Sequence, residues 1–336
     1  MKNSYSQIVR DLVKDLPKND YPVLNTRLWV ETWFHFIINQ HLRSMRDLMS
    51  YLKATGTQFH LSTFSRANQN RNAEVFSDMY KKIAQKVRKK FDKKFQPILA
   101  LDSTTITLTS KLFHQNNYRE AKLLCSQNSE TKIPEDISIE LEKIHDHRMF
   151  MSSEKELESA GIVVMDRGFA SQEIIKRFSQ KKQLFVIRIK SNYTLLMLSD
   201  GWCLLGKKNP VKCRVVMFGD IATKKEYYLA TNLPENTSPN VGFSNEDVGE
   251  IYRKRWAIEL LWKFLKMHLK LDKLITKNYQ GVVIQIWACL IVYLILLLVE
   301  IPEIFGEKLL DKLRYLQVII HETLPNISIK SCRGFG

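Results

Sequence analysis

Two aspartates stand where an apolar run ends, and their chemistry needs an explanation. Asp102 closes the run ILALD and Asp166 closes the run GIVVMD, and small or polar residues follow each of them. Because buried strands exclude unpaired charge, a carboxylate in this position is satisfied by a backbone cap, an arginine or a metal ion. For either aspartate alone, an Asx-turn or an ion pair, such as Asp166 with Arg167, explains the pattern as well as a metal site does.

A third acidic residue lies in an amphipathic segment between residues 244 and 275. The segment opens with a capping-box pattern, Ser244 with Asp247 three residues later, and its periodicity predicts one continuous helix. At about 100° per residue, Glu259 falls on a face that otherwise carries a tyrosine and basic side chains. These neighbours are Tyr252, Arg255, Lys263, Lys266 and Lys270.

Two interpretations of this helix face remain open. A solvated face explains the charges, because Glu259 can pair with Arg255 and Lys263 at a spacing of four residues. It does not explain Tyr252. In the functional interpretation, Glu259 gives a third oxygen ligand to a metal site formed with the two aspartates, while Tyr252, Arg255 and Lys266 hold phosphates beside it.

The elements that must position these acids belong to a mixed α/β region that begins after Pro97. Short apolar runs typical of buried strands cover residues 98–102, 161–166, 184–190, 213–218 and 227–233. The stretch between residues 192 and 245 is rich in strand and turn patterns, as if inserted between the sheet and the helix that follows. Residues 244–275 and 279–321 return to helical periodicity.

The N-terminal region is helical from Thr26 to about Phe95, with Ser62 as a candidate N-cap. Its later helices are densely basic, which indicates a small helical DNA-binding module. For residues 86–94, a solvated lysine-rich helix is an equally good explanation. The basic side chains are Arg66, Arg71, Lys81, Lys82, Lys86, Arg88, Lys89, Lys90, Lys93 and Lys94.

The overall composition favours a nucleic acid as the partner. The formal net charge is +16 and the pI is near 9.5, and a field of this size attracts phosphates. An anionic membrane surface and a basic face that serves solubility are the alternatives. The five cysteines are scattered and contain no Cys-x-x-Cys pair, which is typical of reduced residues in a cytosolic protein.

One apolar segment, residues 282–299, is long enough to cross a bilayer and is interrupted only by Gln285. It lies late in the chain and follows an amphipathic helix, so we expect a core helix buried on most sides rather than a membrane span. The N-terminus lacks the uninterrupted apolar core of a signal peptide. These features predict a cytoplasmic protein with no membrane partner.

The spacing Tyr252-x2-Arg255-x3-Glu259-x6-Lys266 resembles the Y-R-E-K signature of the IS4 insertion-sequence transposases, a branch of the DDE transposases. LDSTTITL around the first aspartate and MDRGFAS around the second are similar to the two aspartate motifs of that family, in the same order. FVIRIKSN at 185–192, YLATNL at 228–233 and STFSRAN at 62–68 extend the resemblance, which covers roughly residues 60–300.

The sequence departs from this family pattern between residues 115 and 150. The family usually has a Lys-x-His stretch there, and this chain has Lys122-Leu123-Leu124, although His145-Asp146 resembles a later His-Asp pair. His145, Asp146 and His147 taken alone are better explained by chance in a polar loop than by a metal site. The divergence leaves open a catalytically inactive relative.

The resemblance implies an α/β fold, with an RNase H-like catalytic domain that carries a β-rich insertion, an N-terminal helical domain and C-terminal helices. Its central strands would carry the two aspartates side by side, and a later helix would bring the glutamate to them. The implied parts are a helical DNA-binding region at 1–95, catalytic parts at 96–192 and 244–300, the insertion at 193–243 and a helical tail at 301–336. In the insertion, Trp202 is a weak candidate to receive a flipped base and a stronger candidate for a core residue.

The resemblance also implies the chemistry. Asp102, Asp166 and Glu259 are expected to be catalytic and to hold two Mg²⁺ ions, for which Mn²⁺ can substitute, during cleavage of a transposon end and joining of its 3′-OH to target DNA. A nuclease or an inactive DNA-binding relative on the same fold is the alternative. We expect transposon-end and target DNA as partners, a homodimer in the cleavage complex, and a place at the bacterial nucleoid. The expected DNA contacts are Tyr252, Arg255, Lys266, Lys263 and Lys270.

Overall fold

The chain folds as two compact units, one helical and one built on a mixed sheet. The helical unit contains residues 1–90, 110–116 and 264–336, and the sheet unit contains residues 91–109 and 117–263. The computed structural model describes residues 4–18, 20–91, 97–108, 119–141, 143–152, 161–199, 201–220, 225–235 and 242–322. Lys93, Lys94, Cys332 and the tail after residue 322 lie outside the described residues.

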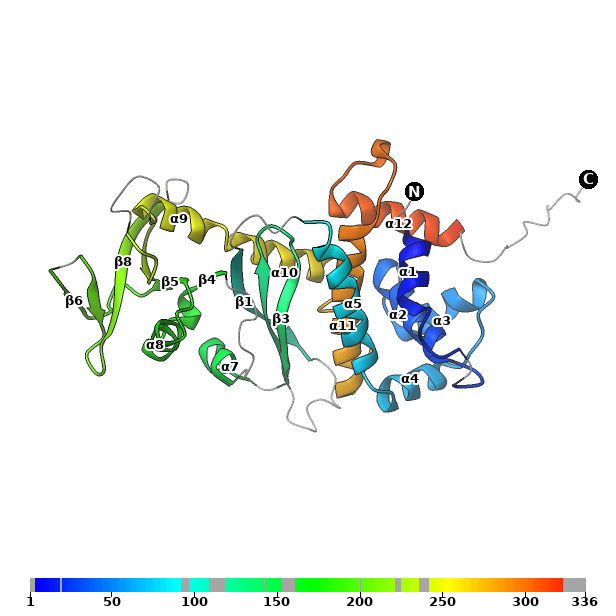
Figure 1. Cartoon of the computed structure of the whole chain (residues 1–336). Helices are drawn as coiled ribbons and strands as arrows, with labels where there is room; N and C mark the ends of the chain where they lie inside the picture. Colours follow the sequence, from blue (N-terminus) through cyan, green and yellow to red (C-terminus); the bar gives the residue numbers. More distant parts are fainter. Residues whose placement is uncertain are drawn as a thin grey trace, which may run out of the picture. The chain divides into compact units, whose positions relative to one another are not determined.

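The helical unit is assembled around one long apolar helix, α11 (Tyr279–Leu298). Helices α2 (Thr26–Ile38), α4 (Leu61–Asn70), α5 (Glu74–Arg88) and α12 (Leu309–Glu322) pack against it. Figure 1 shows α11 beside α5. Helices α1 (Tyr5–Val13) and α3 (Met45–Ala54) complete the unit, together with the short 3₁₀ turn η2 (Glu303–Phe305). Among its described residues, the region up to Phe91 thus contains helices and no strand.

Among the described helices, α11 is the one long and apolar enough to cross a membrane. Of its most apolar 18-residue stretch, 89% is buried inside the protein. Its buried polar residue, Gln285, is fully satisfied there. The side-chain amide donates to the carbonyls of Lys270 (3.0 Å) and Lys273 (2.9 Å) and accepts from the N–H of Ile275 (3.1 Å). These contacts give α11 the environment of a core helix, as the sequence predicts.

The sheet unit contains nine strands among its described residues, in the order β3-β2-β1-β4-β5-β9-β8-β7-β6. Five of them cover the predicted apolar runs, whereas the region between residues 115 and 150 gave no strand prediction and contains β2 and β3. The bounds are β1 (Ile98–Thr107), β2 (Glu120–Asn128), β3 (Pro134–Glu140), β4 (Ile162–Met165), β5 (Phe185–Ile189), β6 (Leu195–Met197), β7 (Cys203–Leu205), β8 (Val211–Asp220) and β9 (Lys225–Thr231).

Strand direction separates the centre of the sheet from its flanks. Strands β1, β4 and β5 run parallel, and β2 and β3 add antiparallel strands on the side of β1. On the other side, β9 pairs antiparallel with β5, and β8, β7 and β6 follow as antiparallel neighbours. The strand-rich segment between residues 193 and 243 thus continues the same sheet.

Period-two alternation in the central strands gives the sheet two apolar faces. Leu101, Met165 and Ile187 point to a core shared with α7 (Asp146–Ser152) and α8 (Gln172–Gln180). Val164 and Val186 point to the opposite core, which is shared with α9 (Asn245–Arg253). In Figure 1 these helices accordingly lie on opposite sides of the strands. The central strands are buried on both faces, as their apolar runs predict.

The buried amide of Gln285 generates a stability prediction. Gln285→Leu should destabilise the protein by about 2–4 kcal/mol, because three buried backbone groups lose their partner and each loss costs about 1–3 kcal/mol before the gain from added apolar contact. Urea unfolding measures the difference. The matched control is Gln280→Leu on the same helix, where the described residues offer the glutamine no hydrogen-bond partner. Equal stability of the two variants would contradict the assignment of Gln285 as a structural core residue.

Candidate active site

The two aspartates of the sequence motifs lie at neighbouring positions of the sheet. Strands β1 and β4 pair in parallel, with Leu101 opposite Met165, so Asp102 and Asp166 follow in register. Strand β4 ends at this point because the 3₁₀ turn η1 (Arg167–Phe169) begins directly after Asp166. The predicted side-by-side arrangement of the two aspartates is therefore present.

The third acidic residue comes from the helices that follow the sheet, α9 and α10 (Trp256–His268). Buried Tyr252, near the end of α9, donates its hydroxyl hydrogen bond to Oδ1 of Asp166 (3.1 Å). Arg255 stands between the helices and pairs with Oε1 of Glu259 on α10 (2.6 Å). Tyr252 thus contacts Asp166 directly, and Arg255 and Glu259 lie in the same unit, near enough to affect the pKa of Asp102.

The prediction of one continuous helix from residue 244 onward is wrong at two points. The chain forms a turn at Lys254 and Arg255, where N–H groups bond to carbonyls three residues earlier, which tightens the helix locally. The helix then ends at His268, before Lys270, whose backbone is left-handed (φ 57°). The capping box of Ser244 and Asp247 at the start of α9 is present as predicted.

Arg188 on β5 is a site residue that the sequence analysis did not single out. Its guanidinium lies 3.4 Å from Oδ1 of Asp166 and 4.3 Å from the ring centroid of Tyr227 on β9. An arginine within the buried strand run LFVIRIK requires a partner in the core, and that requirement is the feature that could have identified it.

Asp102 and Asp166 differ in their electrostatic environment. Burial raises the pKa of Asp102 to about 6, with a further upward effect from Glu259 and Asp146 and an opposing one from Arg255. Burial alone would also raise the pKa of Asp166. The Arg167 backbone N–H, the guanidinium groups of Arg255 and Arg188 and the Tyr252 hydroxyl instead lower it below its usual value. Neighbouring cations therefore offset the burial of Asp102 less completely than that of Asp166.

The donor chemistry of these residues fits a divalent metal ion, but their side chains are not arranged as a ready cage. Three carboxylates are hard oxygen ligands of the kind that Mg²⁺ prefers, and the raised pKa of Asp102 marks a carboxylate that a cation would stabilise. No group of three acidic, histidine or cysteine side chains among the described residues stands close enough to hold an ion. Glu259 is paired with Arg255 and Asp166 with Arg188.

A fourth carboxylate, Asp146, connects the two aspartate motifs. It accepts a hydrogen bond from the Ser103 hydroxyl (2.6 Å) and forms an ion pair with Lys122 (2.5 Å). A Cβ atom at Gly168, just after Asp166, would lie 2.6 Å from Asp146, so this glycine lets the two segments approach. The rings of His145 and His147 beside it stack, with centroids 6.1 Å apart. The sequence analysis attributed Asp146 and its two histidine neighbours to chance in a polar loop. In the structure Asp146 lies beside Ser103 of the first aspartate motif and Gly168 of the second.

The remaining predicted DNA contacts lie on or after α10. Lys263 is exposed and Lys266 is partly buried. Lys270 is 5% exposed, and its ammonium donates to the carbonyls of Phe36, Asn39 and Leu42. These three acceptors occupy the ammonium, so the prediction that Lys270 contacts DNA is wrong. Trp202 is half-buried, with the Lys212 ammonium 5.6 Å from its ring centroid.

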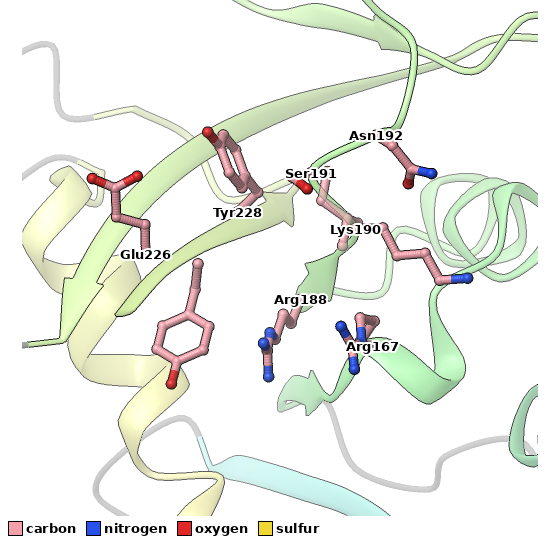
Figure 2. A pocket seen from close by; sticks show the side chains of 9 residues that line it. Arg167, Arg188, Lys190, Ser191, Asn192, Glu226 and Tyr228 are labelled. Atoms are coloured by element: carbon pink, nitrogen blue, oxygen red, sulfur yellow. The ribbon is translucent and has the colours of Figure 1, made fainter. Parts of the chain in front are cut away.

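Two pockets flank the Asp166 side of the site. One, of about 280 Å³, is lined by Arg167, Arg188 and Lys190 on one side and by Glu226 and Tyr228 on the other (Figure 2). The second, of about 370 Å³, has aromatic and arginine walls from β5, β8, β9 and the α9–α10 junction. Its lining residues are Arg188, Phe218, Tyr227, Tyr252, Arg253, Arg255 and Trp256. Both pockets offer cationic side chains to an anionic ligand.

The chain is similar to proteins described as transposases. A family model described as the transposase DDE domain matches residues 93–295. A putative transposase for the insertion sequence element IS4SA from Synechocystis is 39% identical over 331 residues, which cover 97% of each chain. A probable transposase for the element IS5377 from Geobacillus stearothermophilus is 26% identical over 263 residues, or 71% of this chain and 67% of the relative. A DDE domain implies an RNase H-like fold and the use of divalent metal ions.

The raised pKa of Asp102 predicts that Asp102→Asn stabilises the metal-free protein at neutral pH. The folded carboxyl binds its proton up to a pKa of about 6 and the unfolded one only to 3.8, so stability falls as the pH rises between these values. Above this range the wild type buries a charge that the variant lacks. We expect a gain of about 1–3 kcal/mol at neutral pH that vanishes below the unfolded pKa, measured by urea unfolding with a chelator present.

The control for this comparison is Glu173→Gln, which removes an exposed carboxylate from α8 in the same unit. Its stability should follow the wild type across the pH range. Added Mg²⁺ should then stabilise the wild type and Glu173→Gln more than it stabilises Asp102→Asn. A pH-independent difference between Asp102→Asn and the wild type would contradict the assigned charge burial.

Proposed function

The chain belongs to the IS4-type insertion-sequence transposases with a DDE domain, and from this premise we propose that it cleaves transposon ends and joins the freed 3′-OH to target DNA. The proposed catalytic residues are Asp102, Asp166 and Glu259. When bound between them, two Mg²⁺ ions would neutralise charge on the reacting phosphate and activate the attacking oxygen, and Mn²⁺ can substitute.

The observation that carries this proposal is the approach of acids from three separate elements. Asp102 lies in β1, one residue after Leu101, which pairs with β4. Asp166 directly follows β4, and Glu259 lies in α10, far along the chain. The upward effect of Glu259 on the pKa of Asp102 supports their proximity. A fold has no structural reason to gather carboxylates that repel one another, so this gathering favours a cation-dependent reaction.

The residues around the acids suit both steps of the reaction. Cleavage forms a bond from a water oxygen to phosphorus and breaks the bond from that phosphorus to the 3′ oxygen, which leaves as the 3′-OH. Joining forms a bond from this 3′ oxygen to a target phosphorus and breaks the bond from that phosphorus to the 3′ oxygen of the neighbouring target nucleotide, which leaves as a new 3′-OH. Arg255 and Arg188 can hold nonbridging phosphate oxygens, because guanidinium groups match them in charge and geometry. The Tyr252 hydroxyl, whose pKa burial raises to about 12, stays protonated and donates to Asp166.

We further propose transposon-end and target DNA as partners and a homodimer as the cleavage complex, in the bacterial cytoplasm at the nucleoid. The helical region at 1–95 is proposed to bind DNA. The segments 96–192 and 244–300 are proposed to form the catalytic domain, with 193–243 as its β-rich insertion and 301–336 as a helical tail. Exposed Lys263 and the partly buried Lys266 remain proposed DNA contacts.

The variants Asp166→Asn and Glu259→Gln test the proposed catalytic role of the acidic residues. Each should reduce end cleavage and strand transfer by more than about 100-fold, since loss of an outer partner alone costs a metal site about 10–100-fold. Wild-type protein should join a precleaved end to target DNA when Mg²⁺ is present, and calorimetry with Mg²⁺ should show weaker binding by both variants. The matched control is Glu250→Gln, an exposed position on α9.

The outcomes of this experiment separate the proposed transposase from its alternatives. Cleavage without any joining of a precleaved end indicates a nuclease on the same fold. Absence of both reactions in the wild-type protein, with DNA binding retained, indicates an inactive relative. Full cleavage by Asp166→Asn would overturn the proposed catalytic role of the carboxylates.

The tyrosine hydroxyl gives a separate prediction. Tyr252→Phe keeps the buried ring and removes only the donor to Asp166, so we expect a loss of about 10–100-fold in cleavage rate, the effect usual for an outer partner of a metal ligand. Tyr279→Phe removes the hydroxyl of an exposed tyrosine on α11 and serves as the control. Equal cleavage rates for these two variants would show that the Tyr252 hydroxyl does not support catalysis.

A further inference from the structure

Helices α3 and α4 form two consecutive helices joined by a short ordered turn. Ser44 caps α3, and the helix ends in a Schellman motif, in which the N–H of Gly56 bonds to Lys53 (3.2 Å) and the N–H of Thr57 to Leu52 (2.9 Å). Gly56 has the left-handed φ of 85° that this motif requires. The chain then begins α4 at Leu61. Residues 55–60 connect the two helices, so the pair resembles a helix-turn-helix with a connection longer than the usual three or four residues.

One face of α4 is locked into the core of the helical unit. Phe64 and Asn68 are fully buried on this face. The Asn68 side-chain oxygen accepts hydrogen bonds from the indole N–H groups of Trp29 (2.7 Å) and Trp33 (3.0 Å) on α2. Two indole donors on one amide oxygen fix the rotation of α4 about its axis. The opposite face is therefore presented in a defined orientation.

That opposite face carries hydrogen-bonding side chains at helical spacing. Ser62, Arg66 and Gln69 are exposed at positions i, i+4 and i+7, and Asn70 is exposed beside them. Within the described part of the chain, these side chains make no hydrogen bond to another group. Arginine, glutamine, asparagine and serine are side chains that recognise base edges in the major groove. A face that serves only solubility would not need this selection.

The charge around α4 complements DNA. Residues 40–72 contain five Lys and Arg residues and one acidic residue, Asp47, whose side chain caps the backbone N–H of Arg43. Arg43, Arg46 and Lys53 are exposed on and before α3. In a helix-turn-helix the first helix crosses the phosphate backbone while the second enters the groove, so these cations stand where phosphates would lie.

The basic helix α5 is a weaker candidate for the same task. Its Lys82 pairs with Asp15 (3.5 Å) and its Lys86 with Asp11 (3.1 Å), both from the α1 region, and Lys81 pairs with Asp78 (3.1 Å). Lys90 donates to the carbonyl of Leu298 (3.0 Å). Part of the basic run therefore serves contacts inside the unit.

We propose that α4 is the recognition helix of this protein and that Ser62, Arg66, Gln69 and Asn70 read base edges in the major groove of the transposon end. The inference rests on the proposed function, because the ends of the element are the DNA that a transposase must distinguish from all other DNA. Sequence-specific binding is thereby assigned to the helical unit and phosphoryl transfer to the sheet unit.

The test measures binding of the full chain to two duplexes by mobility shift. One duplex carries the terminal sequence of the insertion sequence that encodes this protein, and the other is a scrambled duplex of the same composition. The double variant Arg66→Ala/Gln69→Ala should bind the terminal duplex at least about 30-fold more weakly, because each of the two lost base contacts is worth about 1–3 kcal/mol. Its affinity for the scrambled duplex should change less than about threefold.

The matched control is Gln85→Ala/Lys89→Ala, which removes one amide and one cation from exposed positions in the last turn of α5 and directly after it, in the same unit. This variant should keep the preference for the terminal duplex. All three proteins should show the same thermal unfolding, since the substituted side chains are exposed. Equal losses on both duplexes, or no greater loss than in the control, would overturn the assignment of α4.

A second measurement tests whether α4 contacts the major groove of the DNA. Methylation of guanine N7, which lies in the major groove, should interfere with binding of the wild-type chain at a cluster of terminal positions. The interference should weaken in Arg66→Ala/Gln69→Ala. Interference by minor-groove methylation alone would overturn the proposal.

These experiments can reject the proposed catalytic function and the proposed recognition helix independently of each other. Asp166→Asn should bind the terminal duplex as tightly as the wild type, although it does not cleave. Loss of cleavage in Asp166→Asn with normal discrimination by the α4 variant rejects the recognition helix alone. Full cleavage by Asp166→Asn rejects the catalytic proposal, whatever α4 does.

Discussion

Neutralisation of clustered carboxylates is the constraint that organises the sheet unit. The parallel pairing of β1 and β4 places Asp102 and Asp166 at neighbouring positions, so the fold must provide positive charge there. Arg188 reaches Asp166 from β5, and the turn between α9 and α10 brings Arg255 to Glu259. The interruption of the long helix is therefore part of the site, because it positions the cation between two acidic elements.

The helical unit has a different requirement. Its buried backbone N–H and C=O groups need hydrogen-bond partners beside α11, a helix that is almost wholly apolar. After α10 the chain turns through residues 269–275 against α11, where water cannot reach every peptide group. Gln285 bonds three of these groups from α11, and the ammonium of Lys270 bonds three carbonyls at the end of α2 and after it. Burial lowers the pKa of Lys270 to about 7, which shows how costly this position is for a charge.

Local patterns predicted the strand ends, whereas partners distant in sequence were not predictable. The positions of Asp102 and Asp166 follow from short apolar runs, each complete within a few residues. Lys270 was misassigned because its acceptors lie 228 to 234 residues earlier, and helical periodicity carries no information on such contacts. Arg188 was overlooked although it stands inside an apolar strand run, where an arginine requires a partner; that partner, Asp166, lies 22 residues earlier. Strand β2 was missed because buried polar residues, among them Lys122, Ser126 and Gln127, break the continuous apolar run that is typical of a buried strand. Strand β3 (PEDISIE) is largely polar and has no such run either.

If the proposed function holds, DNA binding would release the acidic side chains from their ion pairs, because their partners are arginines, which also bind phosphate. A guanidinium that bonds Glu259 or Asp166 has the same fork that bonds a phosphate, so an incoming phosphate competes for Arg255 and Arg188. Each arginine that turns to phosphate leaves a carboxylate without its cation, and that carboxylate gains affinity for a divalent ion. By linkage the effect is reciprocal, so metal and DNA would each strengthen binding of the other. The ion pairs seen around Arg255 and Arg188 are thus compatible with a site that assembles on its substrate.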